Sequence, residues 1–288
     1  MRLSRLDALW WPDHGIRKRD VVHYYRAVSP VLLPHLRQRP FTIKRHYQGP
    51  RSPFEWVKDA PSELPDWIPV APLPARSRGG APVRYALVND EPALLWMIEF
   101  GAVDLHVWTA RVDRPERPDY VLFDLDPAGV PFRDVVTAAL LLREALAALG
   151  LESLVKTTGG AGLHVHVPIT RRHTHAEARE FARVVAAALR RSSRGLVTTE
   201  RARARRRGVF VDTKMNGHGQ QVACVYSVRP APGAPVAAPL RWDELEQDLE
   251  PGDLTMDAVS ARAARDGDLF SPVLAGRQRL GRALRTVG

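Results

Sequence analysis

The feature that most constrains the fold is a regular succession of strand and helix patterns in the middle of the chain. RPDYVLFDLDP, residues 117–127, is an apolar strand pattern, and the helix pattern FRDVVTAALLLREALAALG, residues 132–150, follows it. LHVHVPI, residues 163–169, alternates as a strand does and precedes a second helix pattern at 176–192. GVFVD, residues 208–212, is a further short strand. This order is typical of an α/β fold.

The first of these strands ends in two carboxylates, Asp124 and Asp126, with one leucine between them. Residues i and i+2 of a strand project from the same face, so the two acids lie side by side. Two like charges this close repel each other unless a cation lies between them, and oxygen ligands favour Mg²⁺ or Mn²⁺. The alternative is that one acid caps the following helix and the other lies in a solvated turn. For an isolated tripeptide of this kind, that alternative is the stronger interpretation.

A third acid, Asp212, ends the strand GVFVD and favours the metal interpretation. Three carboxylates could then converge at one edge of one sheet. Such a set suits in-line nucleotidyl transfer, in which one divalent ion activates a 3′-hydroxyl and a second holds a triphosphate. It also suits metal-dependent phosphodiester hydrolysis, but triphosphate-binding elements would then have no purpose.

Between these acids lies a glycine-rich turn, KTTGGAGLHVH, residues 156–166. A turn of small residues around Gly159 can expose backbone N–H groups to phosphate, and Thr158 and His164 could add side-chain donors. The alternative is an ordinary turn with structural histidines. His166 shares a face with His164, so the pattern does not decide which of them is functional. Zinc is disfavoured because no cysteine cluster accompanies the pair.

The chain is basic, with 42 Lys plus Arg against 32 Asp plus Glu and a net charge of +10. This balance favours a polyanionic partner such as nucleic acid, although a high-GC genome would enrich arginine whatever the function. Phe54 and Trp56 could offer a stacking surface for a base, or they could be core residues. The basic groups of interest are Lys18, Lys44, Arg45, Arg229 and the run RARARRR at 201–207, which holds Arg205, Arg206 and Arg207.

Other segments give expectations about structure and compartment. Helix patterns cover 18–36 and 90–102, the second with Asp90 at its N-cap, and PFTIKRHY at 40–47 reads as extended. APLPARSRGGAP at 71–82 predicts a surface loop, and RPAPGAPVAAP at 229–239 predicts a surface strap. A single cysteine excludes an intramolecular disulfide, and no apolar run is long enough to span a membrane. We therefore expect a cytoplasmic protein with no membrane association.

Four segments together are similar to the polymerase domain of bacterial ligase D, a branch of the archaeo-eukaryotic primase superfamily used in non-homologous end joining. They are LHVWTARVDRPERPDYVLFDLDP, KTTGGAGLHVHVP, GVFVD and YSVRPAPGAPVAAPL. The resemblance runs over nearly the whole chain. It implies an α/β (α+β) fold with a primase-type catalytic core, whose RNA-recognition-like mixed or antiparallel sheet is flanked by helices. We expect one domain, with an N-terminal α/β module at 1–90, the catalytic core at 91–230, and a strap and helices at 231–288.

The resemblance also implies roles for individual residues. Asp124, Asp126 and Asp212 resemble the metal-binding triad, which is expected to hold two Mn²⁺ or Mg²⁺ ions. Further residues match positions that bind the incoming nucleotide or DNA. These are Thr158 (a serine in the family), Gly159, His164 and Arg229 for the triphosphate, Lys44 near the nucleotide and 3′-end, Phe54 near the template base, and Lys18 for a 5′-phosphate. We expect Arg45 and the arginine run to contact DNA as well.

Some positions depart from the family pattern. A second phosphate-binding lysine is replaced by Ala8, a lysine of the glycine-rich motif is Ala161, and a basic segment is replaced by residues 217–220, GHGQ. Recognition of a 5′-phosphate is largely electrostatic, so these losses weaken the case for dedicated end bridging.

The expected function is metal-dependent addition of ribonucleotides or deoxyribonucleotides to a DNA 3′-hydroxyl, in gap filling or end processing for repair. The expected partners are DNA with gaps, ends or primer-template junctions, nucleoside triphosphates, Ku and a separate DNA ligase. We expect the protein itself to be associated with the nucleoid in the cytoplasm. No ligase or nuclease module is recognisable, so a stand-alone primase-polymerase is expected, with a fragment of a longer protein as the alternative. The alternatives are a primase that starts primers de novo and a non-catalytic DNA-binding repair module.

Overall fold

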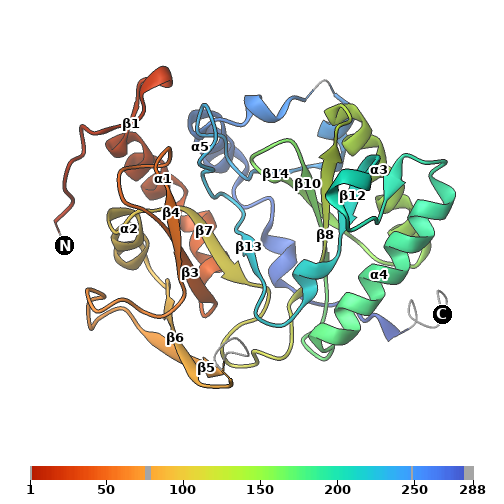
Figure 1. Ribbon diagram of the computed structural model, residues 1–288, viewed down its shortest axis with the longest axis horizontal. Helices are drawn as coiled ribbons and strands as arrows, with labels where there is room; N and C mark the ends of the chain where they lie inside the picture. The colour runs from red at the N-terminus through yellow and green to blue at the C-terminus, as the bar shows by residue number, and fades with distance from the viewer. Residues whose placement is uncertain (1, 75–78, 248, 282–288) are drawn as a thin grey trace. The chain divides into compact units, whose positions relative to one another are not determined.

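The computed structural model describes residues 2–74, 79–247 and 249–281. The chain divides into two compact units, each assembled from three segments (Figure 1). The first unit comprises Met1–Asp113, Gln221–Ala238 and Gly252–Asp268, and the second comprises Arg114–Gln220, Pro239–Pro251 and Leu269–Gly288. The expected modules at 1–90, 91–230 and 231–288 stay a prediction.

The first unit is built on an antiparallel sheet. Its strand order is β13 (Gln221–Ala223), β7 (Ala102–Trp108), β3 (Pro40–His46), β6 (Pro82–Leu87) and β5 (Val70–Pro74), and β4 (Phe54–Val57) also pairs with β3. Helix α1 (Lys18–Leu36) packs against α2 (Glu91–Glu99) and α5 (Met256–Asp266), and α2 packs against β7. A small hairpin of β1 (Leu9–Trp11) and β2 (Ile16–Arg17) precedes α1.

Most local predictions for this unit are confirmed. The helix pattern at 18–36 is α1, and the extended pattern at 40–47 is β3. Helix α2 begins after Asp90, whose carboxylate accepts a hydrogen bond of 2.9 Å from the Ala93 N–H, as an N-cap does.

Two predictions about surface segments are corrected. Residues 71–74 of the expected loop belong to β5, an edge strand, where a proline costs no ladder hydrogen bond; residues 75–78 lie outside the described residues. The expected strap at 229–239 is buried in its second half, where Ala234, Val236 and Ala237 are 0% exposed. Small side chains fill space without an amphipathic pattern, so periodicity could not reveal this burial.

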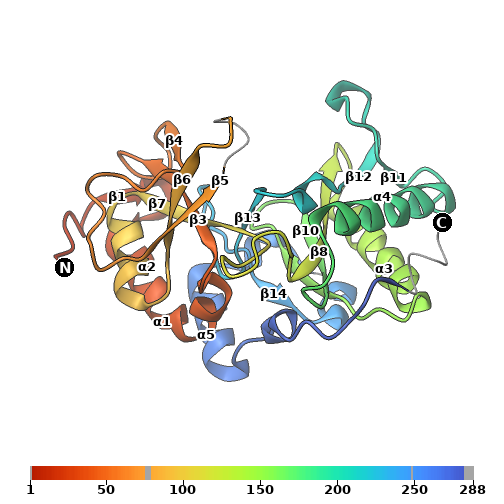
Figure 2. The ribbon, with the colours of Figure 1, turned by 90° about the horizontal axis from the view of Figure 1, so that it is seen from below.

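The second unit contains the sheet that the central strand patterns predicted. Its strand order is β11 (Val197–Thr198), β12 (Gly208–Asp212), β8 (Tyr120–Ala128), β10 (Leu163–Pro168), β9 (Leu154–Thr157) and β14 (Pro239–Leu240). Only β11 and β12 are parallel, so the sheet is mixed and mainly antiparallel. Helices α3 (Phe132–Ala148) and α4 (His175–Ser192) both pack on β8 and contact each other, which places them on one face (Figure 2).

Strand β8 has one face under the helices and another carrying the acids. Phe123 is 0% exposed and meets Phe181 of α4 edge to face, with ring centroids 6.5 Å apart. Because side chains alternate along a strand, Asp124 and Asp126 project from the face opposite α4. The predicted mixed sheet flanked by helices is therefore confirmed, with the two acids on the face opposite α4.

Short 3₁₀ turns connect these elements. They are Pro12–His14, Arg203–Arg205, Lys214–Asn216, Trp242–Glu246, Pro251–Asp253 and Ser271–Leu274. None of the helices in the described ranges is long and apolar enough to cross a membrane.

Candidate active site

The three predicted acids meet on the sheet of the second unit. Asp212 of β12 is paired directly with Asp124 of β8, and Phe210 is paired with Asp126. On the other side of β8, His164 of β10 is also paired with Asp124. Residues directly opposite each other share a face, with Cβ atoms about 5 Å apart. Asp124 therefore lies between a carboxylate and an imidazole, whose Nε2 atom is 3.2 Å from Asp124 Oδ1.

The three carboxylates Asp124, Asp126 and Asp212 lie close enough to repel one another. Burial raises the pKa of Asp126 to about 6, and the negative charges of Asp124 and Asp212 add to the effect. Arg206 and Arg203 oppose it only in part. Arg206 lies over the ring of Phe210, with its guanidinium carbon 3.5 Å from the ring centroid. A divalent cation would relieve this repulsion.

The donor set fits magnesium or manganese better than zinc. Three carboxylates offer only oxygen atoms, and Mg²⁺ binds through one or two carboxylates with water or substrate phosphates at its other positions. Within the described ranges, no three acid, histidine or cysteine side chains form a ready-made cage for one ion. A site that is completed by substrate phosphates needs no such cage, so the carboxylates are suited to ions that arrive with a nucleotide.

The glycine-rich turn packs directly against these acids. A Cβ atom on Gly162 would lie 2.6 Å from the Leu125 carbonyl oxygen and 3.4 Å from Asp126 Oδ1, so only glycine fits at this position. Gly159 has a φ of +70°, which glycine adopts without strain. The Thr158 hydroxyl accepts hydrogen bonds of 3.2 Å from the N–H groups of Gly160 and Gly162. Thr158 thus holds the turn in shape, a role that the sequence pattern did not indicate.

The structure separates the two histidines of β10. His164 lies beside Asp124, as described above. His166 is 2% exposed and packs between Tyr120 and Phe270, with ring centroids 4.7 Å and 5.0 Å away. His164 is therefore the histidine of the candidate site, and His166 belongs to the core.

A second cluster of polar side chains surrounds Asp104 in the first unit. Asp104 is 0% exposed, and its Oδ2 atom accepts a hydrogen bond of 2.8 Å from His106 Nε2 and lies 3.2 Å from Lys44 Nζ. His46 Nε2 lies 3.8 Å from the other carboxylate oxygen. A carboxylate only accepts hydrogen bonds, so the proton of the His106 ring is on Nε2.

Opposite charges in this cluster keep Asp104 ionised. Burial by itself raises the pKa of Asp104, but the contacts with His106 and His46 and the charge of Arg229 outweigh it and hold the pKa well below its ordinary value. Burial lowers the pKa of His106 and outweighs the opposing effect of Asp104, so the ring is neutral. Asp104 is therefore the counter-ion for the predicted nucleotide-binding residue Lys44, and the charge of Arg229 also acts on it.

Two exposed aromatic rings lie over this cluster. Phe54 and Trp56 of β4 are 48% and 47% exposed. Lys44 Nζ is 4.3 Å from the Phe54 ring centroid, and the Trp56 ring meets His106 edge to face at 4.9 Å. Rings with one side in solvent are available for stacking on a base.

The remaining predicted DNA-binding residues contact other groups of the protein to different degrees. Lys18, the first residue of α1, is 5% exposed and forms an ion pair of 2.6 Å with Glu99. Its backbone N–H donates to the carbonyl of Ala8, where the family pattern has a second lysine. Arg45 lies over the rings of Tyr47 and Phe100. In the arginine run, Arg205 pairs with Glu200 at 3.3 Å, and Arg207 donates to the carbonyls of Ala204 and Arg206.

Sequence reasoning missed Asp104, His46 and His106. A signal was present, because Asp104 and His106 alternate within AVDLHVW, a strand that is buried throughout. A charged residue in a fully buried strand needs a partner, which marks it as structural or functional.

Comparisons with known proteins agree with one another. A family model described as LigD, primase-polymerase domain, matches residues 17–270. The chain is 32% identical over 278 residues to the multifunctional non-homologous end joining DNA repair protein LigD of Mycobacterium tuberculosis, covering 93% of this chain and 36% of that protein. It is 29% identical over 276 residues to the bifunctional non-homologous end joining protein LigD of Bacillus subtilis, covering 94% and 43%. The chain thus spans less than half the length of these relatives.

A solved structure gives the same result. The polymerase domain from Mycobacterium tuberculosis ligase D, in complex with DNA, matches this fold with a TM-score of 0.89 and 31% sequence identity. The match covers 96% of this chain and 98% of that one.

Proposed function

The chain belongs to the LigD primase-polymerase domain family, as its motifs predicted, and from this premise we propose that it is a metal-dependent nucleotidyltransferase. It adds nucleotides to a DNA 3′-hydroxyl in gap filling or end processing during non-homologous end joining. The observation that carries the proposal is the register that pairs Asp124 with both Asp212 and His164, with Asp126 beside them on the same face.

Each part of the second unit's site has a role in this reaction. Asp124, Asp126 and Asp212 would hold two divalent ions, Mn²⁺ or Mg²⁺, and these ions would supply charge neutralisation and Lewis-acid activation of the 3′-hydroxyl. His164 donates a hydrogen bond to the triphosphate. The backbone of the glycine-rich turn, shaped by Thr158 and Gly159, contributes N–H donors near the phosphates.

The cluster around Asp104 supports nucleotide and DNA binding in the same proposal. Lys44 and Arg229 bring positive charge to the nucleotide, and Phe54 stacks on a template base. Lys18, Arg45, Arg205, Arg206 and Arg207 contribute to DNA binding. The pairing of Lys18 with Glu99 means that a 5′-phosphate has to compete with a carboxylate for this lysine.

The proposed partners are DNA with gaps, ends or primer-template junctions, together with nucleoside triphosphates. Ku and a separate DNA ligase are proposed as partners in repair, and the cytoplasm, at the nucleoid, is the proposed compartment. The family also implies a preference for ribonucleotides, which requires a sugar pocket that accepts a 2′-hydroxyl.

Primer extension on a short gapped duplex with a 5′-phosphate tests the proposal. The wild-type protein and an Asp124→Ala/Asp126→Ala variant are compared in Mn²⁺ with ribonucleotides and with deoxyribonucleotides. We expect incorporation by the wild type and at least a 100-fold loss in the variant, with circular dichroism showing that the variant is folded. A template without a primer, run in parallel, separates this function from de novo primer synthesis. A folded wild-type protein that binds DNA but incorporates nothing would instead be a non-catalytic repair module.

A further inference from the structure

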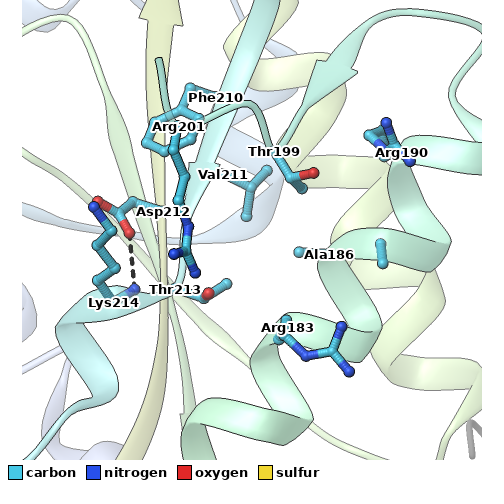
Figure 3. Close-up of a pocket in the computed structure, with 11 residues that line it drawn as sticks. Arg183, Ala186, Arg190, Thr199, Arg201, Phe210, Val211, Asp212, Thr213 and Lys214 are labelled. Atoms are coloured by element: carbon cyan, nitrogen blue, oxygen red, sulfur yellow. Dashed lines mark hydrogen bonds between the residues drawn. The ribbon is translucent and has the colours of Figure 1, made fainter. Parts of the chain in front are cut away.

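Lysine and arginine side chains usually lie in solvent, where water balances their charge. Those that line a pocket of about 300 Å³ beside α4 (Figure 3) follow this rule, since Arg183, Arg190, Arg201 and Lys214 are all exposed. Lys18, at the start of α1, does not follow it, because it is only 5% exposed. Burying a charge costs free energy unless a partner offsets the cost, so the groups around Lys18 show what this position is built to hold.

The partner of Lys18 is Glu99, the last residue of α2. Glu99 Oε2 is 2.6 Å from Lys18 Nζ, and the side chains of Glu99 and Lys18 are 22% and 7% exposed. The same carboxylate accepts a hydrogen bond of 3.2 Å from the Ser4 N–H and a further one from the Ser4 hydroxyl. A carboxylate in the last turn of a helix is unfavourably placed toward the helix dipole, so Glu99 is not there to stabilise α2.

Glu99 is charged in this position. Burial by itself raises the pKa of Glu99, but the hydrogen bonds from Lys18 and Ser4 outweigh it and lower the pKa below its ordinary value. An ionised carboxylate held by an ammonium, a hydroxyl and a backbone N–H occupies donors that a phosphate oxygen would otherwise use. Glu99 therefore takes the place of an external anion at Lys18.

The backbone donors at this end of α1 are occupied as well. The first N–H groups of a helix have no partner within it and readily bind an anion. Here the Lys18 N–H donates to the Ala8 carbonyl and the Arg19 N–H donates to the Leu6 carbonyl, each at 2.9 Å. The Arg19 guanidinium is 2.7 Å from a carboxylate oxygen of Asp7. The segment that precedes α1 thus occupies donors that an anion at this helix end would need.

We infer that Glu99 determines how this protein responds to a 5′-phosphate on DNA: it holds Lys18 as a terminal phosphate would, so that ends with and without the phosphate bind almost equally well. The inference rests on the proposed function, which takes Lys18 as a DNA-binding residue. A phosphate that reaches Lys18 has to displace Glu99 from its hydrogen bonds, and exchanging one charge-assisted contact for another gains little affinity. Ala8, whose carbonyl accepts from the Lys18 N–H, supplies no second cation to favour the phosphate.

Equilibrium binding of gapped duplexes tests the inference without requiring catalysis. The downstream strand carries either a 5′-phosphate or a 5′-hydroxyl, and fluorescence anisotropy in chelator gives Kd. The test variant is Glu99→Gln, whose amide removes the charge but still offers Lys18 an acceptor, and circular dichroism checks its fold. Glu99→Gln/Lys18→Gln removes the lysine in addition. The matched control is Glu91→Gln on the same helix, because Glu91 lies 3.6 Å from Arg26 of α1 and their side chains are 39% and 56% exposed.

We expect wild type and Glu91→Gln to bind the two duplexes with Kd values within about twofold of each other, and Glu99→Gln to bind the phosphorylated duplex about tenfold more tightly than the other. The double variant should lose this preference. A preference of about tenfold for the phosphate in wild type, which needs no variant to measure, would overturn the inference. A folded Glu99→Gln without the preference, or a double variant that keeps it, would do the same. Wild-type protein that binds as expected but does not extend primers would contradict the proposed function and leave the role of Glu99 intact.

Discussion

Asp212 lies directly opposite Asp124 across the antiparallel ladder between β12 and β8. This pairing brings the third acid to the face that already carries Asp126, where burial raises the pKa of Asp126 and the charges of Asp124 and Asp212 raise it further. The candidate site is therefore a consequence of strand register. Its behaviour can be tested through the residues that fix this register and through those that surround the acids.

The metal-free protein should lose stability as pH rises through about 6, because of Asp126. The folded carboxyl has a pKa of about 6, against 3.8 for an unperturbed aspartate. Below pH 3.8 the carboxyl is protonated in both the folded and the unfolded protein, so it does not affect stability. As the pH rises from 3.8 to about 6, the unfolded protein releases this proton more readily than the folded protein, so the free energy of unfolding falls. Above about 6 this loss of stability is complete. The free energy of unfolding of Asp126→Asn relative to wild type should therefore increase by about 1 kcal/mol as the pH rises across this range, after discounting for partial exposure. Urea denaturation in chelator at several pH values measures this difference; an unchanged difference across the range would contradict it.

Gly162→Ala should disrupt the site, whereas Gly160→Ala should not. A Cβ atom at Gly162 would clash with the Leu125 carbonyl at 2.6 Å, and at Gly160 it would meet only Thr158 Oγ1 at 3.5 Å, an ordinary contact. Displacing the turn by about 1 Å costs on the order of 100-fold in rate when it positions reacting groups. Single-turnover incorporation measures the effect, and equal rates in the two variants would show that the turn has no positioning role.

Asp104→Ala should destabilise the protein by about 3 kcal/mol, because it leaves Lys44 without its counter-ion and the buried His106 ring without its hydrogen-bond acceptor. Asp13→Ala is the control, since Asp13 pairs with Arg51 at the surface, with side chains 71% and 61% exposed. Loss of this surface ion pair should lower the free energy of unfolding by less than about 1 kcal/mol. Chemical denaturation compares the two variants, and similar values for both would show that the cluster is not held together by Asp104.

DNA affinity should fall steeply with salt if the basic residues contact phosphates. Arg205→Gln/Arg207→Gln should lower the slope of log Kd against log salt by about two, because each lost phosphate contact removes about one released counterion. The control is Arg133→Gln/Arg172→Gln, which removes the same charge from two exposed residues outside the arginine run. An affinity that does not depend on salt would show that the basic residues do not contact phosphates, and the net charge of +10 would then reflect only the amino-acid composition of a high-GC genome.

The local patterns of the sequence determined the elements and the chemistry of the triad. Helix periodicity placed α1 and the start of α2 correctly, although α2 ends at Glu99 and Ala102 already begins β7; the Asp90 cap was predicted from its position before an apolar run. The shared face of Asp124 and Asp126 also followed from sequence, because the period of a strand is a property of neighbouring residues.

Only the tertiary structure decided which distant residues join these acids. His164 and His166 are equivalent in the alternating pattern, but the register of β10 against β8 pairs His164 with Asp124 and leaves His166 opposite Leu122. The burial of Val236 and the cluster around Asp104 likewise depend on segments that are remote in the chain. Register and packing arise from contacts between such segments, so no local sequence pattern predicts them.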